Sequence, residues 1–339
     1  MLQSLDLDCD RRNARFPDPL REALTADDRR LVVVGARGWI GRTLLDLLYE
    51  ALGPAAFRRR VCAFGSVAAE IDLSDDFRLT QAPLSHLGAL ASRPTLLFHL
   101  AFLTKDKVAG MDAEDYARAN RALSAQVEGA LDRIGVDRLF VASSGAAAFA
   151  DDPGAAADLR LYGALKREDE VRFSAWALAE AATRRAAIGR IYSVSGPWMN
   201  KHETYALASF ILDGLARRPI EVRAPIRVFR SYVAVREVLG VVLAALLSAD
   251  GEPALAFSTG GEALELGEVA AAAARMFGFE AVRRPTGDGP DNVYVGDNTA
   301  WSRLLVRYGL AHLPLEAQIA ETAAWLARET GGPGRCGLA

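Results

Sequence analysis

A tyrosine and a lysine lie four residues apart in the segment LYGALKRE, at Tyr162 and Lys166. Residues with this spacing lie on the same face of a helix, so their side chains can meet there. A phenol has an ordinary pKa of about 10, which is too high for an efficient base near neutral pH. A neighbouring ammonium stabilises the phenolate and lowers that pKa. The spacing is therefore typical of an acid–base pair, but also of two amphipathic side chains on an ordinary surface helix.

The elements around this segment alternate between short apolar runs and helical periods. The run LVVVG at 31–35 is continuous and β-branched, as in strands that are buried on both faces of a parallel sheet. Further strands are predicted at residues 61–64, 95–100, 138–142 and 186–192, with helices at about 117–134 and 161–180. This alternation predicts an α/β fold with a Rossmann-type, doubly wound parallel sheet.

Three glycines form the sequence GARGWIG directly after the first strand, at Gly35, Gly38 and Gly41. Glycine lets the chain turn tightly, lets the backbone approach a pyrophosphate and lets the helix pack close to the strand. The N-terminus of the following helix supplies amide donors and a favourable dipole. Because the glycines stand between a buried strand and an amphipathic helix, they predict a dinucleotide-binding turn.

Changes in this pattern along the chain predict the domain organisation. Residues 1–29 are polar, show no clean period and are expected to form an N-terminal extension preceding the fold. The dinucleotide-binding domain is predicted over 30–195, with 233–258 returning to it. Beyond Gly196 and Pro197 the alternation loosens, and residues 196–232 and 259–339 are predicted to form a smaller mixed substrate-binding lobe. Its helices, together with the returning one, are expected at about 205–216, 235–247, 266–277 and 315–329.

The glycine spacing resembles that of the short-chain dehydrogenase/reductase superfamily, specifically its extended branch of NAD(P)-dependent epimerases, dehydratases and reductases that act on nucleotide sugars. Further motifs of that branch match in order from Leu31 onward. They are Asp72 in IDLSD, His99-Leu100-Ala101, Asn120, Ser143-Ser144-Gly145, Tyr162 with Lys166, residues 190–197, and Arg230 in RSYVAVREV. This ordering favours the acid–base pair over two unrelated surface side chains.

The resemblance implies that Ser144, Tyr162 and Lys166 are the catalytic residues. Tyr162 is expected to exchange a proton with a sugar hydroxyl or ketone, and Lys166 to lower the pKa of Tyr162 and hold the nicotinamide ribose. Ser144 is expected to hydrogen-bond the reacting oxygen. Ser143 is the alternative, because the following AAAF lacks the family's usual Val-Tyr-Gly and leaves the alignment open by one residue.

The resemblance also implies a set of cofactor contacts. They are Gly35, Arg37, Gly38, Trp39, Ile40, Gly41, Asp72, Ala101, Tyr162 and Lys166. Sites for NAD place a carboxylate at the end of the second strand, whereas here Gly65 and Ser66 follow that strand and the first acid is Glu70. Arg37, inside the glycine turn, could reach a 2′-phosphate. The sequence therefore favours NADP, with NAD as the other possibility.

Residues that the chain lacks reduce the number of candidate reactions. Relatives that are 4,6-dehydratases carry an Asp-Glu pair where this chain has Gly145 and Ala146, which cannot move a proton. Relatives similar to GDP-fucose synthase use a Cys and a His, whereas His202 has no cysteine near it in the sequence. The main prediction is 4-keto reduction of a nucleotide-diphosphate sugar. The alternatives are a nucleotide-sugar 4-epimerase working through a transient ketone, and a reductase of a non-sugar carbonyl.

Substrate contacts are expected from Ser144, Asn200 and Arg230, the last at the position that in relatives contacts the substrate diphosphate. Relatives also pair as homodimers through a four-helix bundle, formed here by the helices predicted at 117–134 and 161–180. Their apolar faces include Leu123, Val127, Leu131, Val171, Phe173 and Trp176.

Composition and charge indicate the partners and the cellular location of the protein. The formal net charge is −3, with 40 basic and 43 acidic residues, so no nucleic-acid partner is expected. The N-terminus lacks the apolar stretch of a secretory signal, and the most apolar later run, 238–247, is about half the length that spans a bilayer. The cysteines Cys9, Cys62 and Cys336 are scattered, which predicts neither disulfides nor a metal site. We expect a cytoplasmic protein without a membrane partner.

Overall fold

The computed structural model describes residues 15–74, 76–104, 111–202, 204–283 and 287–330. Cys9, Cys336 and half of the expected N-terminal extension lie outside these ranges. The described chain forms two compact units. The first consists of residues 16–192 and 239–259, and the second of 193–238 and 260–330.

The first unit is built on an eight-stranded sheet with the order β11-β7-β6-β5-β1-β2-β4-β3. Its strands are β1 (Arg30–Val34), β2 (Val61–Gly65), β3 (Ala69–Ser74), β4 (Phe77–Pro83), β5 (Thr95–His99), β6 (Val136–Ser144), β7 (Arg185–Ile191) and β11 (Ala254–Ser258). All neighbouring strands are parallel except β3 and β4. The predicted α/β class with a doubly wound parallel sheet is confirmed.

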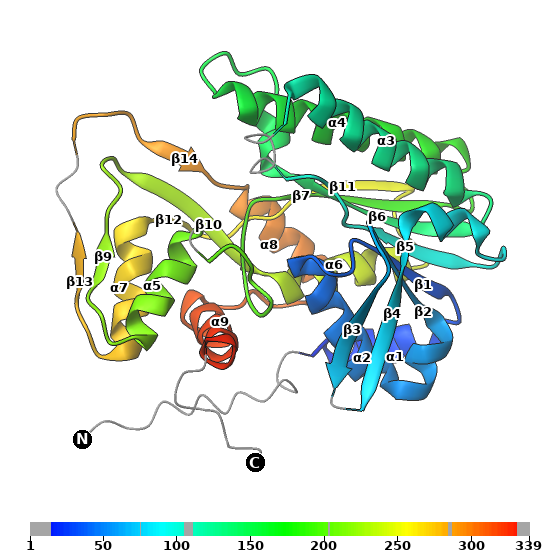
Figure 1. Cartoon of the computed structure of the whole chain (residues 1–339), viewed down its shortest axis with the longest axis horizontal. Coiled ribbons are helices and arrows are strands. Elements are labelled where there is room, and N and C mark those ends of the chain that lie inside the picture. Colours follow the sequence, from blue (N-terminus) through cyan, green and yellow to red (C-terminus); the bar gives the residue numbers. More distant parts are fainter. Residues whose placement is uncertain (1–14, 75, 105–110, 203, 284–286, 331–339) are drawn as a thin grey trace. The chain divides into compact units, whose positions relative to one another are not determined.

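Helices cover both faces of this sheet. They are α1 (Asp18–Ala26), α2 (Trp39–Arg60), α3 (Ala113–Leu131), α4 (Ala157–Ala179) and α6 (Val235–Leu247), the last of which begins in the second unit. The helices α3 and α4 lie side by side on one face (Figure 1). Strands β1 and β5 are neighbours although three other strands, β2, β3 and β4, lie between them along the chain, which makes their carboxyl ends the switch point where such sheets bind ligands.

Residues 18–26 form a helix, although we expected them in an extension that precedes the fold. Leu20 and Leu24 are spaced by four and are buried, because they lie on the helical face that is turned toward the core. Phe16, two residues before the helix, is buried as well. Arg60, near the end of α2, donates a hydrogen bond to the carbonyl of Leu24 (2.8 Å). The first unit therefore begins before its first strand.

The second unit contains smaller sheets and helices. Its larger sheet comprises β8 (Ser193–Ser195), β10 (Val228–Ala234), β12 (Ala263–Glu265) and β14 (Asn292–Tyr294), and its smaller one β9 (Ile220–Val222) and β13 (Ala281–Arg283). Its helices are α5 (Ala206–Leu215), α7 (Leu266–Phe277), α8 (Asn298–Arg307) and α9 (Leu315–Glu329).

Candidate active site

The glycine turn, Gly35 to Gly41, lies between the carboxyl ends of β2 and β5. The Gly35 amide donates to the carbonyl of Phe64 (2.8 Å), at the end of β2. Gly35 has a φ of +91°, and a Cβ there would lie 2.7 Å from the Ala101 nitrogen. A Cβ at Gly41 would lie 2.3 Å from the Gly35 carbonyl oxygen. Only glycine fits these two positions without a backbone shift.

The first turn of α2 is open to an anion. Gly38 precedes the helix, is exposed and supplies no side-chain cap, and the first turn contains no acidic residue. The amides of a first helical turn have no acceptor within the helix. They therefore suit a pyrophosphate, and the turn fits a dinucleotide cofactor. Arg37 is exposed beside them, while Trp39 is buried and Ile40 half-buried.

Asp72 lies on β3, one of the two edge strands of the sheet. Its carboxylate accepts a hydrogen bond from Arg78 (2.7 Å), and its side chain is 72% exposed. IDLSD opens a hairpin with β4, so β4, and not β3, pairs with β2. The structure thus places one strand between Asp72 and β2, and its contact with the cofactor stays a prediction.

The helix α4 presents Tyr162 and Lys166 on one face. The Lys166 ammonium donates to the Ala142 carbonyl on β6 (2.7 Å) and lies 3.7 Å from the centre of the Phe102 ring. The Tyr162 ring packs edge-on against the same phenyl ring, with centroids 5.6 Å apart. Burial lowers the pKa of Lys166 to about 8, although the carboxylates of Asp169 and Glu170 oppose this shift. One aromatic residue therefore contacts both members of the predicted pair.

The loop that carries Phe102 is held by α3. Asn120, a buried residue, accepts a hydrogen bond from the Leu103 amide (2.8 Å). Tyr116 donates its hydroxyl proton to the Leu103 carbonyl (2.6 Å). Two side chains of α3 thus hold the amide and the carbonyl of Leu103, which accounts for an asparagine in this helix.

The two serines at the end of β6 have different partners. Ser143 donates to the carboxylate of Glu170 (2.5 Å). Ser144 accepts a hydrogen bond from the Ala146 amide (3.2 Å) and so caps the short 3-10 helix Gly145–Phe149. Successive residues of a strand point to opposite faces, so only one serine can face a given site. Because the Ser143 hydroxyl already binds a carboxylate, Ser144 remains the better candidate for orienting a substrate oxygen.

Close backbone contact brings α4 against the turn that follows Ser144. A Cβ on Gly163, the residue after Tyr162, would lie 2.1 Å from the Ala146 carbonyl oxygen. The ring of Tyr192 packs on Gly145, where a Cβ would lie 2.5 Å from it. Glycine at 163 therefore allows the close approach that brings Tyr162 near Ser144.

Sequence reasoning missed Glu170 as a member of the site. It follows Lys166 by four residues and Tyr162 by eight, so all three lie along one face of α4. Arg190 on β7 binds its carboxylate through two nitrogens, at 2.8 and 2.7 Å. The helical spacing was the available signal, but the strand partners depend on tertiary structure.

His99, at the end of β5, is buried and uncharged at neutral pH. Burial and the nearby Lys166 charge lower its pKa to about 3. Both ring nitrogens lack a hydrogen-bond partner among the described residues, and the ring packs edge-on against Phe173 (5.3 Å). His99 therefore adds no positive charge beside Lys166.

Comparison with known proteins identifies the family. The model of the NAD dependent epimerase/dehydratase family matches residues 31–260. The chain belongs to this family. It is thus an NAD(P)-dependent enzyme of the extended short-chain dehydrogenase/reductase type. No curated protein sequence matches the chain.

Solved structures of this family have the same fold. MoeE5 in complex with UDP-glucose and NAD is 21% identical, with a TM-score of 0.66 over 89% of this chain and 99% of its own. The UDP-glucose 4-epimerase of Thermotoga maritima is 16% identical, with a TM-score of 0.64 over 89% and 99%. The UDP-N-acetylglucosamine 4-epimerase of Methanobrevibacter ruminantium M1, solved with UDP-N-acetylmuramic acid, is 16% identical, with a TM-score of 0.66 over the same shares.

The expected substrate residues Arg230 and Asn200 lie in the second unit of this epimerase/dehydratase family member. Arg230 donates to the Phe229 carbonyl (2.8 Å) and to the carbonyl and side-chain oxygens of Asn292 (3.2 and 2.9 Å). Burial lowers its pKa. These described partners are all uncharged, so the guanidinium charge is not neutralised by them. Asn200 is exposed in a loop where Trp198 and Lys201 have positive φ values of 65° and 62°.

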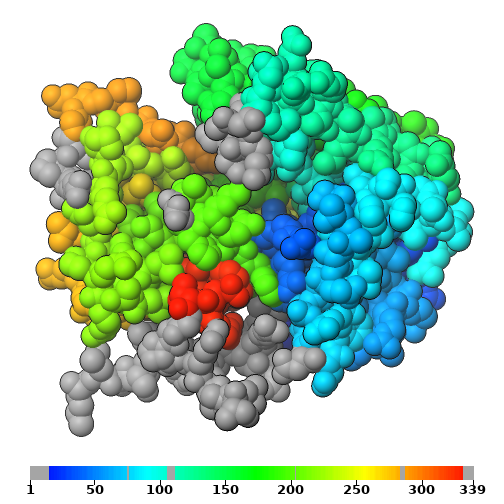
Figure 2. All heavy atoms as spheres, viewed as in Figure 1, coloured from blue at the N-terminus to red at the C-terminus, as the bar shows by residue number. Residues whose placement is uncertain are grey.

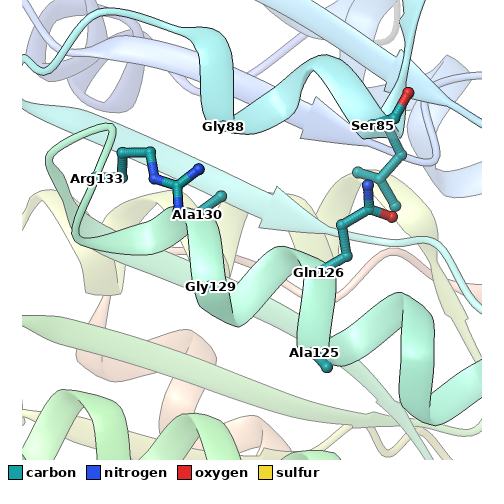
Figure 3. Close-up of a pocket in the computed structure, with 8 residues that line it drawn as sticks. Ser85, Gly88, Ala125, Gln126, Gly129, Ala130 and Arg133 are labelled. Atoms are coloured by element: carbon teal, nitrogen blue, oxygen red, sulfur yellow. The ribbon is translucent and has the colours of Figure 1, made fainter.

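A pocket among the described residues is lined by residues 84–88 and 125–133, far in the sequence from Asn200 and Arg230. Its volume is about 250 Å³, and it opens between α3 and the 3-10 helix Leu84–Ala89, with Gln126 and Arg133 on one side and Ser85 on the other (Figure 3). No lining residue is a predicted site residue. Among the described residues no cluster of side chains could hold a metal ion, and no described helix is long and apolar enough to cross a membrane.

Proposed function

We propose that the protein is a nucleotide-sugar 4-epimerase that works through a transient 4-keto intermediate. The observation that carries this proposal is the Tyr162–Lys166 pair on α4, with Lys166 bonded to the end of β6 near the switch point. The sequence favoured 4-keto reduction, but the similar solved structures include epimerases of UDP sugars, which favours the alternative. This reaction requires no acid or base in addition to the Tyr162–Lys166 pair.

Each residue of the pair has a defined task in this proposal. The bound nicotinamide supplies the acceptance and return of a hydride at C4. Tyr162 takes the proton of the 4-hydroxyl and later gives it back, because Lys166 holds the phenolate at neutral pH. Ser144 donates a hydrogen bond to the reacting oxygen. Arg230 binds the diphosphate, which its positive charge and uncharged described partners favour, and Asn200 is proposed as a further substrate contact.

The proposal is tested by supplying UDP-glucose, UDP-galactose or UDP-N-acetylglucosamine without added NADH or NADPH. We expect at least one of them to convert to its C4 epimer, and that epimer to convert back. The products are separated by chromatography. A sugar that is changed only when a reduced cofactor is added and consumed would contradict an epimerase.

Reduction remains a second candidate because of the cofactor site. The strand β2 ends at Gly65 without a carboxylate, and Arg37 is exposed in the glycine turn. If this site is built for a 2′-phosphate, nicotinamide fluorescence will show tighter binding of NADPH than of NADH. Arg37→Ala will then remove that preference by weakening NADPH alone. Tighter NADH binding, unaffected by the mutation, would remove the case for NADP and for reduction.

We also propose that the protein pairs through the outer face of α3 and α4. Of the apolar residues expected there, Val127, Leu131, Phe173 and Trp176 are buried in the first unit's core, Leu123 packs against that core, and Val171 is exposed. Val171 and Leu178 on α4 are 67% and 58% exposed and lie two turns apart, so they share one face. Side chains of α3 also lie at the surface (teal in Figure 2).

The apolar part of this face is therefore smaller than the sequence indicated. Light scattering of the wild type is expected to give twice the mass of the chain, and Val171→Asp combined with Leu178→Asp a monomer. A wild-type monomer at micromolar concentration would overturn the proposal.

A further inference from the structure

The Glu170 carboxylate joins two strand ends to the helix that carries the catalytic pair. Ser143 at the end of β6 and Arg190 on β7 are direct neighbours in the register of the sheet. Both donate to Glu170, through one bond from the hydroxyl (2.5 Å) and two from the guanidinium (2.8 and 2.7 Å). The carboxylate is only 13% exposed, so these charge-assisted bonds are largely shielded from water.

These bonds fix the backbone on both sides of the predicted reaction centre. Ser143 directly precedes Ser144, and Arg190 precedes Tyr192, whose ring packs on Gly145. The turn after Ser144 is therefore held from β6 and from β7. Because Glu170 lies on α4 and binds both strands, it also fixes the position of α4, and with it the position of Lys166.

The charge of Glu170 matters because Lys166 is buried. Its surroundings contain the carboxylates of Asp169 and Glu170 on α4, and the uncharged His99 ring on β5. The Arg190 guanidinium on β7 is neutralised by Glu170. Removing the Glu170 charge would thus take away one favourable partner of the ammonium. This change favours loss of the Lys166 proton.

We propose that Glu170 is a positioning residue for the Tyr162–Lys166 pair, which fixes the ends of β6 and β7 and keeps the buried Lys166 ammonium charged. This inference rests on the role proposed for Lys166, namely to hold the nicotinamide ribose and to stabilise the Tyr162 phenolate. It can be tested without any sugar substrate, so failure of the epimerase proposal and failure of this one are distinguishable.

The test is the affinity for NADH as a function of pH, followed by nicotinamide fluorescence. In the wild type the affinity is expected to fall as the pH rises through the pKa of Lys166, which is about 8. In Glu170→Gln the midpoint of that fall is expected about one pH unit lower, since an opposite charge at close range shifts a pKa by about one to three units. Glu170→Asp keeps the charge but shortens the reach, so it should keep the wild-type midpoint and bind more weakly at every pH.

Glu168→Gln is the matched control on the same helix. Glu168 also receives two hydrogen bonds from an arginine, Arg121 (2.7 Å each), but its side chain is 41% exposed. The control should leave the midpoint where it is in the wild type. A wild-type midpoint in Glu170→Gln, or an equal shift in Glu168→Gln, would overturn the proposal. If Glu170→Gln does not fold, as judged by thermal melting, a displaced midpoint in Glu170→Asp serves as the contradicting result.

Discussion

Tyr162→Phe lowers the rate of nucleotide-sugar epimerisation by about two to four orders of magnitude, the contribution typical of a positioned general acid–base group. The substitution removes only the hydroxyl, so the ring keeps its edge-on contact with Phe102. Lys166 keeps its bond to Ala142 and its charge. NADH affinity and thermal stability are therefore expected to stay close to those of the wild type. The measurement is the initial rate at saturating sugar, with NADH affinity measured in parallel.

Tyr49→Phe is the control for this prediction. Tyr49 lies on α2, packs against Phe57 and Phe77 and shares a long hydrogen bond with Ser74 (3.4 Å). It loses the same hydroxyl outside the proposed site and should turn over sugar at the wild-type rate. A Tyr162→Phe protein that keeps its rate would remove Tyr162 from the chemistry.

Gly163→Ala is expected to destabilise the protein by about 2 kcal/mol or more, since an added methyl in a packed site forces backbone shifts. The Cβ would lie 2.1 Å from the Ala146 carbonyl oxygen. All the atoms that it would meet belong to the backbone, which cannot rotate away as a side chain can. The helix α4 would have to withdraw from the turn after Ser144. Because this separates Tyr162 from Ser144, turnover should fall together with stability. Urea unfolding measures the first effect and initial rates the second.

Gly129→Ala, in the last turn of α3, supplies the contrast. A Cβ there meets nothing within 4 Å. Alanine restricts the unfolded chain and favours the helix, so this change should stabilise by up to about 1 kcal/mol. Two glycine-to-alanine changes in neighbouring helices are therefore expected to have opposite signs. Equal effects would show that the contact between Gly163 and Ala146 carries little strain.

The sheet was predictable because its strands are short apolar runs next to turn residues. The helices at 235–247, 266–277 and 315–329 have the boundaries expected from their periodicity. The helix α1 was missed because two prolines hid the spacing of Leu20 and Leu24. The β3–β4 hairpin was also missed, and only the register of the sheet shows that β4 separates Asp72 from β2.

The site was only partly predictable for a similar reason. A spacing of four along one helix indicated Tyr162 and Lys166, and the glycine turn has a local signature. Ser143 and Ser144 could not be distinguished by sequence, since the choice depends on which hydroxyl meets Glu170 across the fold. Phe102 gave no signal, because its contact with Lys166 depends on a loop that Asn120 and Tyr116 hold from another helix.

The fate of a deuterium atom at C4 of UDP-glucose tests the central claim most directly. The sugar is incubated with the protein and NAD, and the C4 position of the product is examined by mass spectrometry and NMR. Hydride removal and return within one site, with Tyr162 moving only the oxygen-bound proton, predicts a C4 epimer that keeps its deuterium. Loss of the deuterium to water, or failure of UDP-glucose, UDP-galactose and UDP-N-acetylglucosamine alike to epimerise, would contradict the account.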